Sequence, residues 1–155
     1  MKRLVTLLVT ALLMTAALCV SASAADYQSA AEDLSAIGMF RGTVNGGFEL
    51  DRAPKRSEAA IMLVRLYGAE EEAAAAYQSG EISHPFKDVG PIASPYVAWL
   101  YTKGITKGAT ATTFNSNAAC TDKNYVVFLL RALGYEDGKD FQYAESLTFA
   151  EKLGF

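Results

Sequence analysis

The sequence predicts an all-α fold, a helical bundle assembled from helix–loop–helix repeats. Three observations indicate it. Apolar residues recur in several segments at the spacing of a buried helix face. Glycines follow these segments, where a helix would end. Finally, a shift of 66 positions superimposes residues 38–68 on residues 104–134 without a gap, so that glycines, aromatic residues and apolar positions coincide.

The repeat is visible in identical residues and extends to a third, shorter copy. A shift of 50 positions places residues 95–105 on residues 145–155, matching Trp99 with Phe149 and Gly104 with Gly154. The repeat therefore predicts two complete units and the start of a third. The residues that are identical in the first two units are Gly38, Gly42, Phe48, Ala53, Leu63, Arg65 and Gly68, which coincide with Gly104, Gly108, Phe114, Ala119, Leu129, Arg131 and Gly134.

Residues 1–24 read as a secretory signal peptide. Lys2 and Arg3 precede an apolar run from Leu4 to Val20, and Ala22-Ser23-Ala24 offers the small residues that a signal peptidase requires. A membrane anchor is the alternative, but about 17 apolar residues are at the short limit for spanning a bilayer. Lipid attachment at Cys19 is a further alternative. We expect an exported protein that leaves the membrane after cleavage.

Composition excludes some classes of partner. The chain has 14 basic and 17 acidic side chains and a net charge of −3, and removal of Lys2 and Arg3 makes the exported part more acidic. Such a chain offers no electrostatic surface for nucleic acid. Only Cys120 lies beyond the signal peptide, so packing rather than an internal disulfide must stabilise the fold.

The first predicted unit, with a linking helix, covers residues 25–79. Leu34 belongs to its first helix, which ends near Gly38, and a loop containing Phe48 leads to a second helix that ends near Gly68. The stretch from Glu70 to Gln78 is rich in alanine and predicts a short linking helix, which we interpret as a solvated connector.

The second predicted unit covers residues 80–138. An extended segment precedes a helix that begins near Pro95, carries Trp99 as a core residue and ends at Gly104. The loop after it contains Phe114, and Thr121 is a good N-cap for the second helix. The apolar face of that helix is predicted to comprise Val126, Val127, Leu129, Leu130 and Leu133.

The third unit, residues 139–155, contains only a first helix. A single helix–loop–helix of this size cannot bury its own apolar face, so the units must pack against one another, as repeats do in solenoid proteins. We expect all three to share one hydrophobic core, with the loops projecting outward.

At these residues the pattern resembles the S-layer homology (SLH) family. The order Phe86-x-Asp88-Val89, Trp99, Gly104-Ile105-x-x-Gly108, Phe114 and an N-capped apolar helix is that of the family. In the first unit, Lys55-Arg56-Ser57-Glu58-Ala59 occupies the stretch where the family has a Thr-Arg-Ala-Glu motif. The resemblance implies an exported bacterial cell-surface protein with a pseudo-threefold bundle, whose grooves bind secondary cell-wall polymers, often pyruvylated, without covalent bonds.

The resemblance also implies which residues bind the polymer. Arg56 matches the arginine that usually contacts the anion, and physical chemistry agrees, because a guanidinium and free N–H groups at a helix N-terminus both favour anions. Glu58 can return its carboxylate to the N-cap amide. Lys103 and Lys107 are predicted to line the same groove as Arg56. In the second unit, Asp122 replaces the arginine.

The sequence also predicts which chemistry to exclude. No acid pair, triad, phosphate loop or histidine–cysteine cluster occurs in a motif, so we expect no enzyme, no cofactor and no metal site. The alternative to polymer binding is a degenerate SLH bundle that acts in protein interaction. Its partner would be a second copy of the chain or a missing C-terminal segment, because the third unit lacks its second helix.

Overall fold

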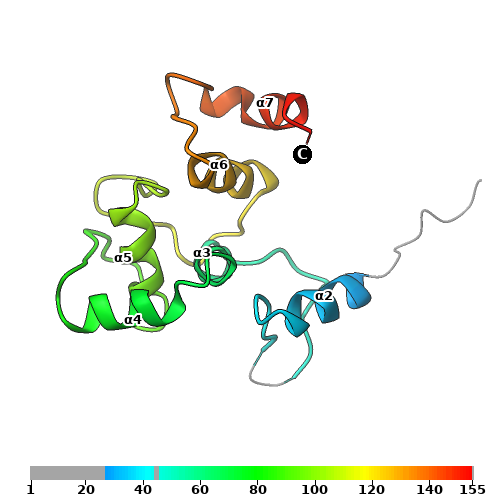
Figure 1. Cartoon of the computed structure of the whole chain (residues 1–155), viewed down its shortest axis with the longest axis vertical. Coiled ribbons are helices and arrows are strands. Elements are labelled where there is room, and N and C mark those ends of the chain that lie inside the picture. The colour runs from blue at the N-terminus through cyan, green and yellow to red at the C-terminus, as the bar shows by residue number, and fades with distance from the viewer. Residues whose placement is uncertain (1–26, 44–45, 155) are drawn as a thin grey trace, which may run out of the picture.

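The computed structural model describes residues 27–43 and 46–154 (Figure 1). The predicted signal peptide of residues 1–24 lies outside them. Within the described residues the chain forms six α-helices, one short 3₁₀-helix and no β-strand, which confirms the predicted all-α class. Among these helices none combines the length and apolar composition needed to cross a bilayer.

The helices follow the predicted order along the chain. The first and second units each contribute a first helix, a loop and a second helix, a linking helix joins these two units, and the third unit contributes one α-helix preceded by a short 3₁₀-helix. The elements are α2 (Tyr27–Ala36), α3 (Arg56–Leu66), α4 (Glu70–Gln78), α5 (Ser94–Thr102), α6 (Asp122–Ala132), η1 (Tyr143–Glu145) and α7 (Ser146–Lys152).

The backbone repeats as the sequence does. Helices α3 and α6 begin and end at positions that are 66 apart. Gly42 and Gly108 both have a positive φ, 69° and 77°, and Glu49 and Asn115 are a second such pair, with φ of 49° and 62°. A positive φ is uncommon in residues other than glycine. The two loops therefore turn in the same way at these two positions, whereas Gly46 and Gly47 have a positive φ and their equivalents, Thr112 and Thr113, do not.

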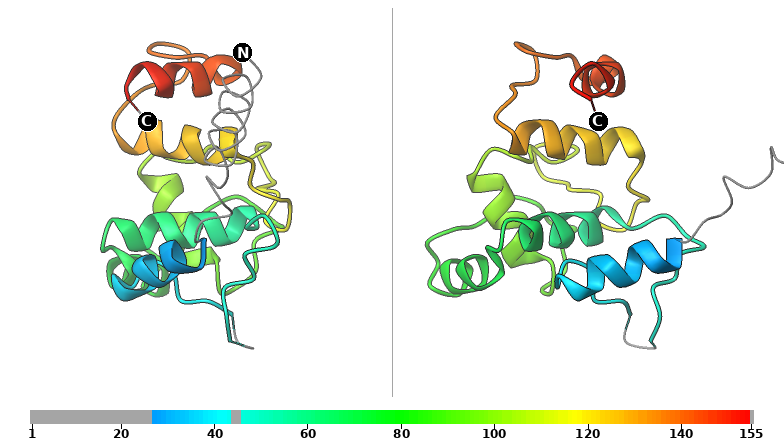
Figure 2. Two further views of the ribbon diagram at one scale, coloured as in Figure 1. Left: turned by 90° about the vertical axis from the view of Figure 1, so that its right-hand side faces the viewer. Right: turned by 45° about the vertical axis from the view of Figure 1, so that its right-hand side comes forward.

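Packing between units follows one pattern. Helix α5 lies against α3 and α4, and α7 lies against α6 (Figures 1 and 2). The first helix of each later unit therefore packs on the second helix of the unit before it. Helix α2, which precedes all of these, lies on the opposite side of α3 from α4 and α5 (Figure 1).

The hydrophobic interior of the described residues is divided into two clusters. The larger one joins α3, α4 and α5, with Leu63 and Leu100 fully buried, and it includes Phe128 of α6. The smaller one joins α6 to α7 and contains Leu130 and Ala150. The expectation of a single shared core is therefore wrong. Neighbouring positions on a helix point in different directions, so α6 can supply Phe128 to the larger cluster and Val127 and Leu130 to the smaller one.

The linking helix α4 is part of the larger cluster rather than a solvated connector. Its bounds are those expected, but Ala73 is fully buried against α5. The acidic side chains of its first turn bind α5 as well, because the Tyr96 hydroxyl donates to Glu70 at 2.6 Å and the Trp99 indole donates to Glu72 at 2.9 Å. Small alanines let the two helices approach closely.

Candidate functional site

The first turn of α3 is seated on the loop of the second unit. The Arg56 N–H donates to the carbonyl of Ala118 at 2.9 Å, and the Ser57 N–H donates to that of Ser116 at 3.1 Å. Lys55, which stands at the N-cap, makes no side-chain capping bond. The loop carbonyls thus replace the missing cap. We expected these N–H groups to be free for an anion, and that expectation is wrong.

Asp88 holds the loop that receives α3. Its carboxylate accepts hydrogen bonds from the N–H groups of Phe114 and Asn115, both at 2.7 Å, and from Ser116 at 3.2 Å. Burial raises the pKa of Asp88, but the three hydrogen bonds together lower it by more, so that the pKa lies below its ordinary value. Asp88 was visible in the sequence only as a motif residue, since its partners are in a distant loop.

The guanidinium of Arg56 lies against two aromatic rings. Its Cζ atom is 4.9 Å from the centre of Phe114 and 4.7 Å from that of Phe128. The Nε atom is buried, and among the described residues it has no hydrogen-bond partner. Burial lowers the pKa of Arg56, and repulsion from Arg131 lowers it further. No carboxylate of the described residues compensates this cation, although a buried charge normally requires a partner.

Arg56 opens onto a cavity of about 360 Å³, here called the second groove. Arg131 lines it too and pairs with Asp137 at 2.9 Å. At its edge the Tyr143 hydroxyl donates to Asn124 at 2.8 Å. Two guanidinium groups, an amide and a phenol therefore surround one cavity, a set of donors suited to an oxygen-rich anion.

Sequence reasoning missed part of the second groove. In the sequence, Asn124 stands where the family has its glutamate, and Arg131 recurs late in a helix, where a salt bridge is expected. Neither is among the predicted binding residues, and Tyr143 is not singled out. The salt bridge of Arg131 exists, but its side chain also faces the cavity. The repeat offered a signal for Arg131, because it coincides with Arg65. No pattern placed Tyr143 beside α6.

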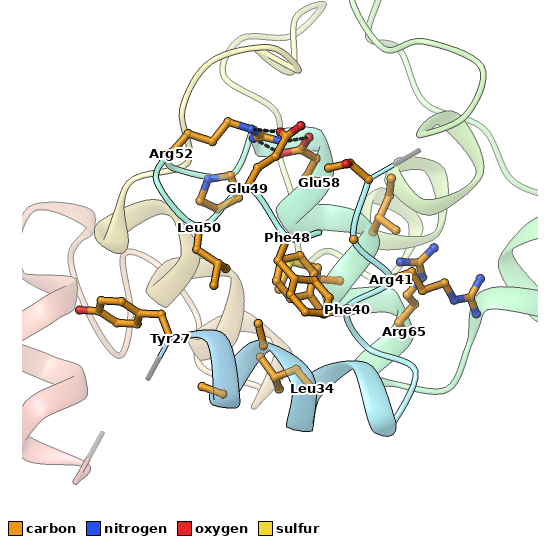
Figure 3. A pocket seen from close by; sticks show the side chains of 17 residues that line it. Tyr27, Leu34, Phe40, Arg41, Phe48, Glu49, Leu50, Arg52, Glu58 and Arg65 are labelled. Carbon is orange, nitrogen blue, oxygen red and sulfur yellow. Dashed lines mark hydrogen bonds and ion pairs between the residues drawn. The ribbon is translucent and has the colours of Figure 1, made fainter. Parts of the chain in front are cut away.

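A second cavity, of about 480 Å³, lies between α2 and α3 and is here called the first groove (Figure 3). Its walls are mainly apolar, and Phe40 and Phe48 stack in it with ring centres 5.0 Å apart. The two grooves are related by the repeat, because their lining residues are 66 positions apart. The equivalent residues are Gly42, Glu49, Glu58, Ile61, Met62 and Arg65 in the first groove, and Gly108, Asn115, Asn124, Val127, Phe128 and Arg131 in the second.

The guanidinium group of Arg52, which lines the first groove, is neutralised by two carboxylates. Arg52 pairs with Glu49 at 2.6 Å and with Glu58 at 2.8 Å (Figure 3). Glu58 also accepts from the Lys55 N–H at 2.7 Å, which confirms its predicted return to the N-cap amide. The hydrogen bond from Arg52 holds the pKa of Glu58 below its ordinary value, and Glu58 and Glu49 raise the pKa of Arg52.

The four predicted binding residues do not surround one cavity. Arg56 lines the second groove and Glu58 the first. Lys103 is exposed, lies 5.2 Å from the ring centre of Trp99 and 3.9 Å from the Glu72 carboxylate. Lys107 is exposed and adjoins Gly108 of the second groove, but neither lysine is among the lining residues. Trp99 itself is buried, as predicted for a core residue.

Nothing in the described part of the chain resembles a metal centre or a reactive thiol. No group of three or more His, Cys, Asp or Glu side chains there could hold a metal ion. The thiol of Cys120 is buried, and burial raises its pKa. A raised thiol pKa disfavours the nucleophilic thiolate.

Residues 85–121 match the family model of the S-layer homology domain. This segment of the chain is similar to the S-layer homology domain. The matched segment contains Asp88, helix α5 and the loop carbonyls on which α3 is seated. S-layer homology domains are non-catalytic cell-surface modules that generally bind cell-wall polymers. No match to the chain was found among curated proteins.

Proposed function

We propose that this chain is a non-catalytic module of the bacterial cell surface that attaches, without covalent bonds, to an anionic secondary cell-wall polymer. The second groove is the binding site, and Arg56 is the anion contact. The observation that carries the proposal is the environment of Arg56: its half-buried guanidinium lies against two rings and has no carboxylate partner among the described residues.

A carboxylate or ketal-linked pyruvate on the polymer would supply the charge that the groove lacks. A guanidinium fork binds a carboxylate through two parallel hydrogen bonds. Phe114 and Phe128 fix the plane of the fork in advance, which reduces the entropy lost on binding. Asn124 and Tyr143 can then hydrogen-bond sugar hydroxyls at the edge of the groove.

The remaining predicted residues have different roles in this proposal. Lys107 is exposed beside Gly108, and we propose it as a second, weaker contact for a long polymer. Lys103 and Glu58 already face Glu72 and Arg52. We propose that these two support their own surfaces and do not touch the polymer.

The test is co-sedimentation of the purified, exported protein with bacterial cell walls that carry pyruvylated polymer. Arg56→Met keeps a side chain of similar length against the rings but removes the charge, so binding should fall by at least about tenfold. Arg52→Met is the matched control, because it removes the guanidinium of the first groove, and binding should be unchanged.

Circular dichroism must show that both variants remain helical. The proposal is wrong if the wild-type protein never sediments with the walls. It is also wrong if Arg56→Met and Arg52→Met weaken binding equally, because that result would mean a diffuse charge effect rather than a site. Binding by wild type should weaken as salt is added, since it depends on an ion pair.

A further inference from the structure

The first groove presents backbone carbonyl groups that are equivalent to those on which α3 is seated in the second groove. In the second groove the loop presents the carbonyls of Ser116 and Ala118 to the first turn of α3. The equivalent carbonyls in the first groove belong to Leu50 and Arg52. In the described residues neither accepts a hydrogen bond, although the Arg52 N–H donates to Glu49 as that of Ala118 does to Asn115.

Among the described residues, the first turn of α6 has backbone N–H donors without acceptors, which complement these free carbonyl groups. It is the repeat equivalent of the first turn of α3, and α6 has the same length. The N–H groups of Asp122 and Lys123 correspond to those of Arg56 and Ser57. They have no hydrogen-bond partner in the part of the chain that the structure describes. Thr121 and Asp122 are exposed, and α7 leaves them uncovered.

We propose that the first groove of one molecule receives the first turn of α6 from a second copy of the chain. The contact would repeat, between molecules, the seating of α3 on the second groove that exists within one molecule. It goes beyond wall binding, because it uses the other groove. The two surfaces differ from each other, so the association is head-to-tail and extends into chains rather than closing as a symmetric dimer.

Charge favours this pairing. Within the molecule, Arg56 enters a groove that contains Arg131, and the repulsion contributes to its lowered pKa. Between molecules, Asp122 takes the place of Arg56 and Arg65 takes that of Arg131, so a repulsion between two guanidinium groups becomes an attraction between unlike charges. Arg65 also pairs with Glu70, as Arg131 pairs with Asp137. The two acidic side chains of the first groove, Glu49 and Glu58, are both paired with Arg52. Opposite charges across an interface favour association and specify the partner.

The contact would also be weaker than its internal counterpart. Within the molecule, Cys120 donates a third hydrogen bond to Pro54, at 2.8 Å. The residue equivalent to Cys120 in the first groove is Pro54 itself, which has no N–H group. An association between molecules therefore makes two of these three backbone bonds, and we expect it to depend on concentration and on salt.

The experiment is sedimentation of the exported protein over a range of concentrations. Leu50→Asp places a charge in the groove at a side chain that is 39% exposed, and Asp122→Arg reverses the charge of the inserted turn. Each should weaken association by at least about tenfold. Ile92→Asp is the matched control, because Ile92 is 81% exposed and lies outside both grooves. It should have no effect.

Mixing gives the sharpest result. Asp122→Arg keeps an intact groove and Leu50→Asp keeps an intact first turn, so the two variants together should form one-to-one dimers that grow no further. A wild type that is monomeric at every concentration would overturn the proposal. So would association that Ile92→Asp weakens as much as Leu50→Asp does, or a mixture that fails to pair. Wall binding is unaffected in either variant if the two grooves act independently, so the two proposals can fail separately.

Discussion

The two grooves share several backbone features but differ in the charged residues that line them. Both are built from a glycine with positive φ, a turn at Glu49 or Asn115, and the first half of a second helix. In the first groove Arg52 is satisfied by two carboxylates. In the second, asparagines occupy the equivalent positions, and Arg56 has no acidic partner in the part of the chain that the structure describes. The repeat thus places a groove beside each of these two helices, while a few substitutions decide whether its cation is available to a ligand.

The largest expected effect is that of Gly108→Ala. A Cβ atom there would lie 2.2 Å from the Phe86 ring and 2.8 Å from the Thr110 carbonyl, at a φ of 77°. Left-handed strain and overpacking together should lower the free energy of unfolding by about 3 kcal/mol. Gly42→Ala meets the Gly47 carbonyl at 2.6 Å but no buried ring at such short range. It should cost less, about 2 kcal/mol. Urea unfolding measures both, and a reversed order would contradict this comparison of the loops.

Asp88→Ala should have the next largest effect, about 2 kcal/mol, because three N–H groups of the second loop lose a charged acceptor. The effect depends on pH. The folded pKa of Asp88 lies below its ordinary value of 3.8, so its stabilisation is complete above that value and is lost as pH falls through the folded pKa. Urea unfolding of wild type and variant should therefore converge at low pH. A constant difference across pH 3 to 7 would exclude the role assigned to the carboxylate.

The two N-caps provide a smaller contrast. Thr121 accepts a hydrogen bond from the Asn124 N–H at 3.3 Å, whereas Lys55 makes no side-chain cap. Thr121→Ala should lower the free energy of unfolding by about 1 kcal/mol. Lys55→Ala should change it by less than about 0.5 kcal/mol, because loop carbonyls bind the first turn of α3. Thermal unfolding of the two variants compares them directly, and equal losses would mean that docking does not replace the cap.

The smallest effect concerns Glu58, whose equivalent in the second groove, Asn124, does not titrate. The hydrogen bond from Arg52 places the pKa of Glu58 below its ordinary value of 4.5. Its stabilisation is thus complete above that pH and is lost as the pH falls through the folded pKa. Unfolding measured between pH 6 and 3 should show a shallower loss of stability for Glu58→Gln than for wild type. Identical slopes would show that the pair with Arg52 contributes nothing.

Much of the local structure was predictable because it depends on residues close in sequence. The linking helix runs from Glu70 to Gln78 as expected, and Thr121 caps α6 as expected. The family assignment was also within reach, since its motif lies in one continuous segment. The apolar face of α6 was predicted less well, because Leu133 is 59% exposed beyond the end of the helix.

The candidate site was only partly predictable. Arg56 could be singled out by its place before a helix, and Glu58 by its distance from the N-cap. That Arg56 lies against Phe114 and Phe128, and that Glu58 belongs to a different groove, could not be. The contacts of Arg56 join residues that are far apart in the chain, and no local pattern encodes them.

The sequence by itself determined the helices, their ends and the repeat, because spacing, caps and glycine conformations are properties of short segments. Only the tertiary structure decided that the core divides at α6, that α4 packs on α5, and that the first turn of α3 gives its N–H groups to a loop and its guanidinium to a groove. These outcomes depend on how distant elements pack together, because a hydrogen bond or an ion pair forms only when the fold brings its two partners into contact.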